Sequence, residues 1–587
     1  MTASSRWPAS RPPRIHSSPS LSPLACPNSN EPLSRRLPRS LHSWDKRSST
    51  IGSRRPLGKQ RTGRSNGEGN RRVTGNIPPV IRPDHVSPRS LDLLVSEFGL
   101  RSIGNLRGVE ISGLTVMTRE VTAGDMFVAV RGANRHGAEF ARDARANGAV
   151  ALLTDDDGAV IAAECGLPIV VVESPRASLG DIARWIYRTD DDAPQYFGIT
   201  GTNGKTSTAY LLEGVLRQMG ITTGLSTTAE RHIAGENFVS RLTTPEASEL
   251  HALIARMKEA AVRAVVIEVS AQALTHNRVS GIRFDVAGFT NLSHDHLDDY
   301  SDMEDYFRAK RALFHPDVAR RGVVSLDTTW GHRIVEESHI PVTTISSTGD
   351  LSAYWQVEVT EDNPAFTAFT LMSADGVSIS TREPVIGRHM AANAGLALVM
   401  LIEAGYDPDV IAAALERDNG IQTYLPGRTE KVSGDRGPNV YVDFGHSPDA
   451  FDHTLAAVRR FTTGRTIMVF GADGDRDASK RFDMARVAAE GCDILIITDH
   501  HPRFEDPASI RTQLLDAARS VANGPEIFEE SPPENAIRLA VSLAREGDSI
   551  LWAGPGHQDY RDIRGERTRY SARELARSAL AEAGWSL

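Results

Sequence analysis

Apolar positions alternate between two periods along most of the chain, and this alternation is typical of α/β proteins. Short apolar runs between residues 108 and 172 predict buried strands, as in MFVAV, AVALL and PIVVV, and they are separated by helix-like stretches such as GAEFARDARANG. The same alternation returns in AVVIEVS and VAGFTNLS, and later in RTIMVFGADG, ILIITDHHPR and SILWAGPGH. Strands that alternate with helices predict parallel sheets, so we expect an α/β fold.

Breaks in the alternation divide the chain into a tail and three α/β domains. We expect order to begin near Val86, where LDLLVSEFGL has helical spacing, and the first domain to span 86–192. A second domain over 193–425 opens with YFGITGTNGKTSTAYLLEGVLRQMG, which reads as a strand, a glycine-rich turn and a helix. A third domain over 426–587 begins within YLPGRTEKV and repeats the alternation.

Residues 1–80 have a different composition from the rest of the chain. They hold 15 Lys and Arg against 3 Asp and Glu, whereas the other 507 residues hold 51 against 72. This tail is rich in Ser, Pro and Arg and has no apolar period, which predicts disorder. A transit segment and a nucleic-acid-binding arm are two interpretations. We favour an extension from an upstream start, because no amphipathic face is evident and no aromatic-interleaved basic motif accompanies the arm.

The overall composition excludes several protein classes. The 587 residues are 40% hydrophobic and 24% charged, which is near the globular average and excludes collagen, coiled-coil and wholly disordered chains. No stretch reaches the roughly 20 apolar residues of a membrane-spanning helix. The three cysteines are far apart and form no CxxC pair, so we expect neither a disulfide framework nor a cysteine-rich zinc site. These features predict a cytoplasmic protein.

The turn GTNGKTS predicts a nucleotide-binding phosphate loop. Its backbone N–H groups and the following helix N-terminus can cradle phosphate oxygens. Lys205 would neutralise the β and γ phosphates, and the Thr206 hydroxyl would ligate Mg²⁺. The spacing departs from the strict Walker pattern, because Ile199 stands six residues before Lys205 and the first glycine is Gly201. Alone, the motif indicates ATP or GTP binding.

Polar residues after two later strands extend this site. Glu268 ends the apolar run AVVIEVS, where a carboxylate points into the crevice at the carboxyl ends of parallel strands. A second run is followed by Asn291 and His296, within NLSHDHLDDY, and Lys310 lies on the helix-like YFRAKRALF. A polar cluster behind two strands of one sheet predicts a metal and phosphate site.

These motifs, together with TTPEASEL, PGRTEKV, VDFGHSPDA, FGADGDRDASKR and DHHPRFEDP in this order, resemble the Mur ligases. Within that family the chain is most similar to the UDP-N-acetylmuramyl-tripeptide synthetases of the MurE type, over about 500 residues. The resemblance implies a small UDP-binding N-terminal domain, a central P-loop ATPase domain with a mostly parallel sheet, and a C-terminal Rossmann-like domain for the incoming amino acid.

The resemblance also implies a reaction. ATP would phosphorylate the D-glutamate carboxylate of UDP-MurNAc-L-Ala-D-Glu, and the amine of a free amino acid would attack the acyl phosphate to give an amide of the peptidoglycan stem peptide. ATP and Mg²⁺ are the implied cofactors, with Lys310 carbamylated to become an anionic metal ligand. Nucleic acid is not an expected partner.

The same resemblance assigns site residues. The catalytic set would be Lys205, Lys310, His296 and Arg428. ATP would be bound by Gly201, Thr202, Asn203, Gly204, Lys205, Thr206, Ser207, Asn291, Asn393, Arg428 and Asp443. The muropeptide and the amino acid would be bound by Thr118, Arg119, Thr243, Thr244, Ser270, His276, Arg278, Arg503, Gly554 and Gln558. Thr206 and Glu268 would ligate one Mg²⁺, His296 would help to hold a second, and carbamylated Lys310 would also hold metal.

Some family motifs are altered here. The uridine-side Asp-Ser-Arg reads Met117-Thr118-Arg119, and Met390 replaces the first Asn of the adenine-side element. In the amino-acid pocket, His500-His501-Pro502-Arg503 replaces Asp-Asn-Pro-Arg, and Gln558 replaces a glutamate. A buried ammonium without a counter-charge is costly, so these changes argue against meso-diaminopimelate. Asp499 and Asp506 are possible counter-charges for another diamino acid.

Three hypotheses follow. The first is a ligase that adds the third stem-peptide residue, a diamino acid. The second is a related ligase with another carboxylate acceptor, of the folate or cyanophycin type. The third is a non-catalytic paralogue that binds nucleotide or UDP-muropeptide. We favour catalysis, because a pure binder would not require the complete set of phosphate-transfer residues.

Overall fold

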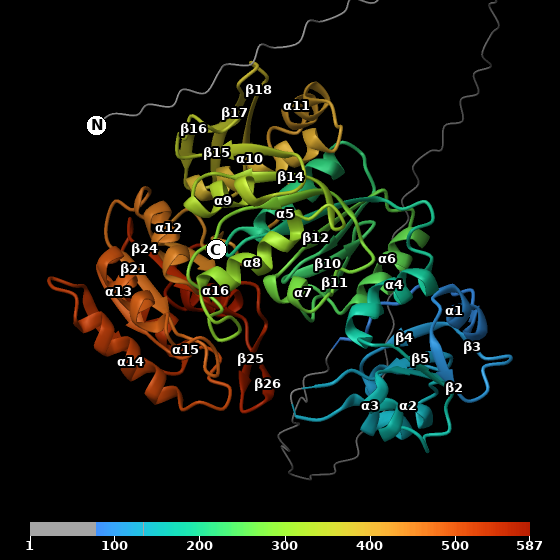
Figure 1. The fold of residues 1–587 in the computed structure, drawn as a ribbon. Coiled ribbons are helices and arrows are strands. Elements are labelled where there is room, and N and C mark those ends of the chain that lie inside the picture. The colour runs from blue at the N-terminus through green and yellow to red at the C-terminus, as the bar shows by residue number, and fades with distance from the viewer. Residues whose placement is uncertain (1–77, 133) are drawn as a thin grey trace, which may run out of the picture. The chain divides into compact units, whose positions relative to one another are not determined.

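Three large sheets organise the chain in a computed structural model that describes residues 78–132 and 134–587 (Figure 1). The predicted disorder of the tail concerns residues that lie, up to residue 77, outside the described part. The predicted helix near Val86 is α1 (Leu91–Glu97), which begins a few residues later. A short ribbon pairs β1 (Arg89–Ser90) with β3 (Glu110–Ile111).

The N-terminal sheet has five strands in the order β2-β7-β6-β5-β4. They are β2 (Arg101–Ile103), β4 (Gly113–Thr115), β5 (Asp125–Val128), β6 (Ala151–Thr154) and β7 (Ile169–Val171). The helices are α2 (Ala141–Ala146), α3 (Asp156–Ile161) and α4 (Pro175–Tyr187), with the 3-10 turns η1 (Thr118–Glu120) and η2 (Gly137–Phe140). All pairs are parallel except β2 with β7. The three apolar runs predicted as strands are β5, β6 and β7.

The central sheet has eleven strands in the order β11-β10-β9-β12-β8-β13-β14-β15-β16-β17-β18. They are β8 (Gln195–Thr200), β9 (Thr223–Ser226), β10 (Glu230–Ile233), β11 (Glu236–Val239), β12 (Ala264–Glu268), β13 (Phe284–Phe289), β14 (Ala319–Ser325), β15 (Val342–Ser346), β16 (Trp355–Asn363), β17 (Phe366–Ser373) and β18 (Ser378–Glu383). The middle of the sheet from β9 to β16 is parallel, and antiparallel strands complete both edges. The sheet is therefore mixed, with the predicted parallel strands at its centre.

Helices cover both faces of this central sheet (Figure 1). They are α5 (Lys205–Gln218), α6 (Ala247–Glu259), α7 (Ala271–Thr275), α8 (Met303–Arg311), α9 (Thr329–Glu337), α10 (Arg388–Glu403) and α11 (Pro408–Arg417), with the 3-10 turn η3 (Ala312–Phe314). Strand side chains alternate between the faces: Val266 packs in one core with α5 and α10, whereas Ile267 packs in the other with α6 and α8. Because β12, β8 and β13 are neighbours and parallel, their carboxyl ends lie side by side.

The C-terminal sheet has six strands in the order β19-β20-β24-β21-β22-β23. They are β19 (Glu430–Lys431), β20 (Asn439–Asp443), β21 (Thr466–Phe470), β22 (Ile494–Ile497), β23 (Glu526–Glu529) and β24 (Ser549–Ala553), and a hairpin of β25 (Tyr560–Ile563) and β26 (Glu566–Arg569) follows. The helices are α12 (Pro448–Arg459), α13 (Arg481–Gly491), α14 (Pro507–Arg519), α15 (Pro533–Leu543) and α16 (Ala572–Glu582). Helices α12 to α14 pack on one face, and α15 and α16 pack on the other. All pairs from β20 to β23 are parallel, as a Rossmann-like domain requires.

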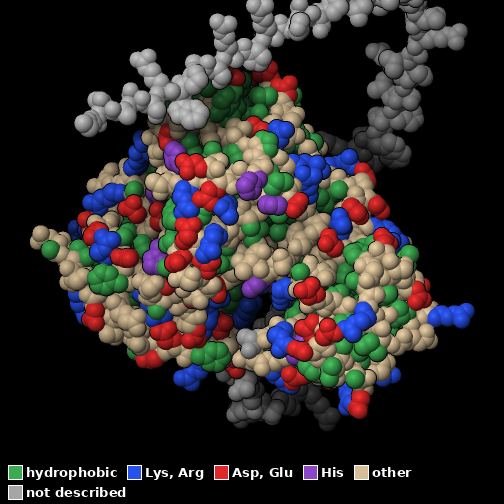
Figure 2. Space-filling view, viewed as in Figure 1, with side chains coloured by type: hydrophobic (Ala, Val, Ile, Leu, Met, Phe, Trp, Pro, Cys, Tyr) green, Lys and Arg blue, Asp and Glu red, His purple; other side chains and the backbone are tan. Residues whose placement is uncertain are grey.

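The surface charge and the lengths of the helices bear on the class of protein. On the face drawn in Figure 2, acidic and basic side chains are interspersed over the described residues. Across residues 78–132 and 134–587, no helix combines the length and the apolar character that crossing a bilayer requires.

Glu383 at the end of β18 predicts a pH-dependent stability. Its side chain is buried, and neither carboxylate oxygen has a hydrogen-bond partner within the described part of the chain. Burial raises the pKa of this carboxyl well above its ordinary value, so the folded state binds a proton that the unfolded chain has released. Stability is then fully present below about pH 4.5 and falls as the pH rises toward the folded-state pKa.

We therefore expect Glu383→Met to raise the unfolding temperature at pH 8 by about 2–4 °C, and by less at pH 5. Thermal unfolding of both proteins at the two pH values checks this. An equal gain at both pH values would show that the Glu383 carboxyl carries no pH-dependent cost.

Candidate active site

The phosphate loop joins β8 to α5, as predicted, and two of its glycines are structurally required. Gly201 and Gly204 have φ of +149° and +87°, in the region that favours glycine. A Cβ at Gly201 would lie 1.8 Å from Thr290 Oγ1, and one at Gly204 would lie 2.4 Å from Asn393 Oδ1. The loop therefore packs closely against the end of β13 and against α10. Its last residues lead directly into α5, so their backbone N–H groups lie at the N-terminus of that helix.

Two lysines converge on this loop. Lys205 Nζ donates to the carbonyl oxygens of Gly201 and Thr202 at 3.1 and 2.8 Å, and Lys310 Nζ donates to Gly201 O at 2.6 Å. The Lys310 ammonium also lies 4.3 Å from the ring centroid of Tyr306, whose hydroxyl accepts from Thr202 Oγ1. Burial first, and then the charge of Lys205, hold the pKa of Lys310 well below its ordinary range. Lys310 is therefore easier to deprotonate than an exposed lysine.

A second group joins Glu268 to the start of α5. Thr206 Oγ1 donates to Glu268 Oε2 at 2.9 Å and accepts from Arg428 Nη2 at 2.9 Å. The Thr228 N–H donates to the same carboxylate, and Lys205 Nζ lies 3.9 Å from it. Burial lowers the pKa of Lys205, an effect that Glu268 opposes. A hydroxyl, a carboxylate and two cations therefore meet at one loop, although they come from three distant segments.

His296 approaches the same region from the segment after β13. Its Nε2 lies 3.7 Å from Asp295 Oδ2, and its ring lies 6.2 Å from the Tyr306 ring that also contacts Lys310. Burial lowers the pKa of His296 to about 4, so its imidazole is neutral and can act as a ligand. Asp295 also accepts from Lys480 Nζ at 2.7 Å, which ties this segment to the C-terminal domain.

These donors fit the cofactors that the sequence predicts. Hydroxyl and carboxylate oxygens are the ligands that Mg²⁺ prefers, and Thr206 and Glu268 supply both within a buried site. The loop N–H groups and the Lys205 ammonium suit polyphosphate oxygens. His296 also lies with Asp298 and Asp299, with one ligand atom of each within 4.8 Å of the others.

The predicted ATP-binding residues lie around the loop. Asn203 N donates to Asn291 Oδ1 at 3.0 Å, and Asn203 Nδ2 donates to Asp449 Oδ2 on α12 at 2.9 Å. Asn393 Nδ2 contacts the Met390 sulfur at 3.6 Å, so the altered motif still holds this amide beside Gly204. The remaining member, Ser207, is buried in the first turn of α5.

Of the two predicted ATP-binding residues from the C-terminal domain, Arg428 lies at the phosphate loop and Asp443 lies at the turn that carries Arg428. The Arg428 guanidinium lies 4.3 Å from the ring centroid of Phe444, and burial lowers its pKa. Asp443 accepts from the N–H groups of Thr429 and Gly445 at 2.7 and 2.6 Å. Arg428 therefore reaches the phosphate loop, whereas Asp443 orders the turn that carries it.

The predicted muropeptide residues form a separate group near the carboxyl end of β12. Thr243 Oγ1 contacts Thr228 Oγ1, and Thr244 Oγ1 donates to Glu268 O at 2.7 Å and accepts from Ser270 N. Thr243 and Thr244 are therefore linked to the residues around Glu268, while the Ser270 hydroxyl caps α7.

Arg278 and His276 lie after α7. Arg278 Nε donates to Glu246 Oε1 at 3.1 Å, and Arg176 of α4 donates to the other Glu246 oxygen at 2.9 Å. Burial, and then the charges of the two arginines, lower the pKa of His276. No sequence motif connects Arg176 with this group, because it lies 70 residues before Glu246.

The N-terminal pair and the amino-acid pocket remain. Thr118 and Arg119 form η1, and the Arg119 side chain is 57% exposed and thus available to a ligand. In the C-terminal domain, Arg503 Nη1 donates to Gly474 O at 2.7 Å, and Gln558 Oε1 lies 2.8 Å from His501 Nε2. Gly554 has a φ of +112°, and a Cβ there would lie 3.6 Å from the His500 ring.

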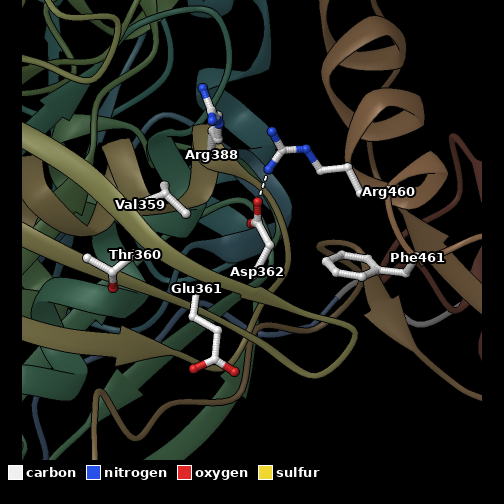
Figure 3. Close-up of a pocket in the computed structure, with 7 residues that line it drawn as sticks. All are labelled: Val359, Thr360, Glu361, Asp362, Arg388, Arg460 and Phe461. Carbon is white, nitrogen blue, oxygen red and sulfur yellow. Dashed lines mark ion pairs between the residues drawn. The ribbon is translucent and has the colours of Figure 1, made fainter.

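The structure thus brings Lys205, Thr206, Glu268, Lys310 and Arg428 together and places His296 beside them. Further residues hydrogen-bond to this site, although no role was predicted for them: Tyr306, Thr228, Asp449, Lys480, Arg176 and Glu246. Tyr306, Glu246, Asp449 and Lys480 lie within the sequence motifs that resemble the family, and this is the sign that could have found them. A further cavity of about 470 Å³ has a different lining (Figure 3), namely Val359, Thr360, Glu361, Asp362, Arg388, Arg460 and Phe461, with Asp362 paired to Arg460.

Comparison with protein families agrees with this geometry. The Mur ligase family catalytic domain matches residues 110–187, the Mur ligase middle domain matches 199–401, and the Mur ligase glutamate ligase domain matches 427–556.

Relatives match over nearly their whole length. A UDP-N-acetylmuramyl-tripeptide synthetase of Leifsonia xyli subsp. xyli is 58% identical over 87% of this chain and 100% of its own length. A UDP-N-acetylmuramoyl-L-alanyl-D-glutamate–2,6-diaminopimelate ligase of Streptomyces avermitilis is 40% identical over 86% of this chain and 99% of its own.

Solved structures share the fold. A UDP-N-acetylmuramoyl-L-alanyl-D-glutamate–2,6-diaminopimelate ligase matches with a TM-score of 0.56 and 25% identity, over 82% of this chain and 97% of that one. MurF of Thermotoga maritima in complex with ADP matches with a TM-score of 0.55 and 17% identity, over 80% and 96%. The predicted fold class and ATP-dependent ligase activity are confirmed, and the chain belongs to the Mur ligase family.

Proposed function

We propose that this ligase adds the third residue of the peptidoglycan stem peptide, a diamino acid, to UDP-MurNAc-L-Ala-D-Glu. The observation that carries the proposal is the convergence of Lys205, Thr206, Glu268, Lys310 and Arg428 on one phosphate loop. The relative named as a tripeptide synthetase, at 58% identity, supports the position of the residue that is added.

The chemistry requires two anions to meet. The D-glutamate carboxylate attacks the γ-phosphorus of ATP, ADP leaves, and an acyl phosphate forms. Lys205 and Arg428 both reach the start of α5, and their charges offset the repulsion between phosphate and carboxylate. The amine of the amino acid then attacks the acyl carbon, loses a proton and expels phosphate, which leaves the amide.

Thr206, Glu268, His296 and a carbamylated Lys310 would hold Mg²⁺. When bound, the metal offsets phosphate charge and orients its oxygens. Carbamylation needs a neutral amine, and the burial of Lys310 beside Lys205 favours that form. The adduct would place an anion beside the Lys205 ammonium, and the two side chains would then attract each other.

The substrates would then divide among the three domains. Residues 86–192, with Thr118 and Arg119, would bind the UDP end, and 193–425 would bind ATP and the muropeptide. Residues 426–587, with Arg503, Gly554 and Gln558, would bind the amino acid. Arg278 suits a substrate carboxylate or phosphate, because its planar fork binds two oxygens at once.

Phosphate release by the purified protein with ATP, Mg²⁺ and UDP-MurNAc-L-Ala-D-Glu tests the proposal, scanned over meso-diaminopimelate, L-lysine, L-ornithine and shorter diamino acids. We expect turnover with one diamino acid and a product heavier by that residue in the mass spectrum. Binding of ATP and muropeptide without turnover for any amine would instead indicate a non-catalytic paralogue.

A further inference from the structure

One acid in the amino-acid pocket has an oxygen with no partner. Asp473 follows β21, at the carboxyl edge of the C-terminal sheet. Its Oδ1 atom is buried and has no hydrogen-bond partner among the described residues, while its Oδ2 atom lies 3.4 Å from Arg503 Nη2. A buried, unsatisfied carboxylate oxygen is costly in free energy, and a ligand with an N–H donor would remove that cost.

The described residues around Asp473 leave its Oδ1 atom without a hydrogen-bond donor. His500 Nε2 is 3.7 Å from Asp473 Oδ1, and burial lowers the pKa of His500 to about 3, so this imidazole is neutral. The pKa of Asp473 lies below its ordinary value despite its burial, with the Arg503 guanidinium among the causes, so the carboxylate is ionised. Arg503 is the cation in contact, and it divides its donors between Asp473 and Gly474 O.

Asp473, His500 and His501 have ligand atoms close enough together to hold a metal ion, but the hydrogen bonds of His501 argue against one. His501 Nδ1 accepts from the Asp562 N–H at 2.9 Å, so its proton is on Nε2, which donates to Gln558 Oε1 at 2.8 Å. Both ring nitrogens are therefore engaged, and two remaining ligands are too few for a transition-metal site. An organic cation fits this set better.

The other acids of this region already have partners. Asp499, one of the two acids considered from the sequence, pairs with Arg511 and accepts from Ser531. The second, Asp506, caps α14 through the N–H groups of residues 508 and 509. Glu505 forms a two-pronged pair with Arg481. Of these four acids, Asp473 is the one that retains a buried oxygen with no partner among the described residues.

We propose that Asp473 binds the terminal ammonium of the incoming diamino acid and thereby determines its selection. The assignment rests on the proposed function and names the counter-charge that Gln558 cannot supply. Gln558 instead fixes the tautomer of His501 beside the pocket. Gly554 keeps the space next to the His500 ring clear of a side chain, which leaves room for an extended amine.

The test compares each diamino acid with its analogue that lacks the terminal amine: L-lysine with L-norleucine, and L-ornithine with L-norvaline. For Asp473→Asn we expect the KM of the accepted diamino acid to rise about 10- to 100-fold, with the KM of ATP unchanged. The KM of the deaminated analogue should change less than about threefold, because it has no ammonium to lose a partner.

Two further variants guard against misfolding and general charge effects. Asp473→Ser should show the same selective loss, and Asp516→Asn, which removes the same charge at an exposed position of α14, should behave as wild type. Thermal unfolding of each variant checks its fold. An equal loss for the diamino acid and its analogue, or no loss, would overturn the assignment of Asp473 alone. Absence of wild-type turnover with any amine would overturn the proposed function, and this assignment with it.

Discussion

Lys205→Ala is expected to lower kcat for ATP-dependent amide formation by about 10³-fold, with a much smaller change in the affinity for the muropeptide. Lys205 is the cation at the start of α5, and its ammonium is held by two loop carbonyls and by Glu268 at 3.9 Å. Its removal leaves the γ-phosphate charge without this partner as the carboxylate approaches. The loss therefore falls on the transition state more than on ground-state binding.

Phosphate release and product formation under saturating ATP and muropeptide measure this effect, and fluorescence titration measures the affinity for the muropeptide. Lys258→Ala is a matched control, because Lys258 on α6 donates to the Arg188 carbonyl instead of to the loop. A Lys205 variant that kept more than a tenth of wild-type kcat would contradict the assigned role.

The sequence predicted most of the elements that build the site, because each is encoded over a few neighbouring residues. Apolar runs identified β8, β12 and β13, and the glycines of the phosphate loop marked the turn before α5. The positive φ at Gly201 and Gly204 is a property of the loop itself and favours glycine there. The clashes that exclude a side chain, in contrast, come from the distant residues Thr290 and Asn393.

The pattern of apolar and polar positions could not predict which polar side chains from distant segments pair with one another. Asp295 receives Lys480 from 185 residues away, and Glu246 holds Arg176 and Arg278 from different elements. Periodicity fixes which face of an element is buried, but the partner of a polar side chain depends on how the elements pack. For the same reason, the sequence proposed Asp499 and Asp506 as counter-charges, whereas both have other partners in the structure.

Lys310→Ala is expected to lower kcat by about 10³-fold, because the buried side chain contacts the phosphate loop through Gly201 O. This loss alone does not distinguish a cationic lysine from an anionic carbamate. The two roles differ in charge, and a small molecule of the right charge can occupy the space that the truncated side chain leaves.

If the functional form is the carbamate, formate or acetate should restore part of the activity of Lys310→Ala, whereas methylammonium should not. Only the unprotonated amine attacks carbon dioxide, and the lowered pKa of Lys310 makes that form easier to reach at pH 8. Wild-type protein in ¹³C-labelled bicarbonate should then show a carbamate resonance that Lys310→Ala lacks. Rescue by methylammonium and not by carboxylates would contradict the carbamate, and it would indicate that Lys310 acts as a second phosphate-facing cation alongside Lys205.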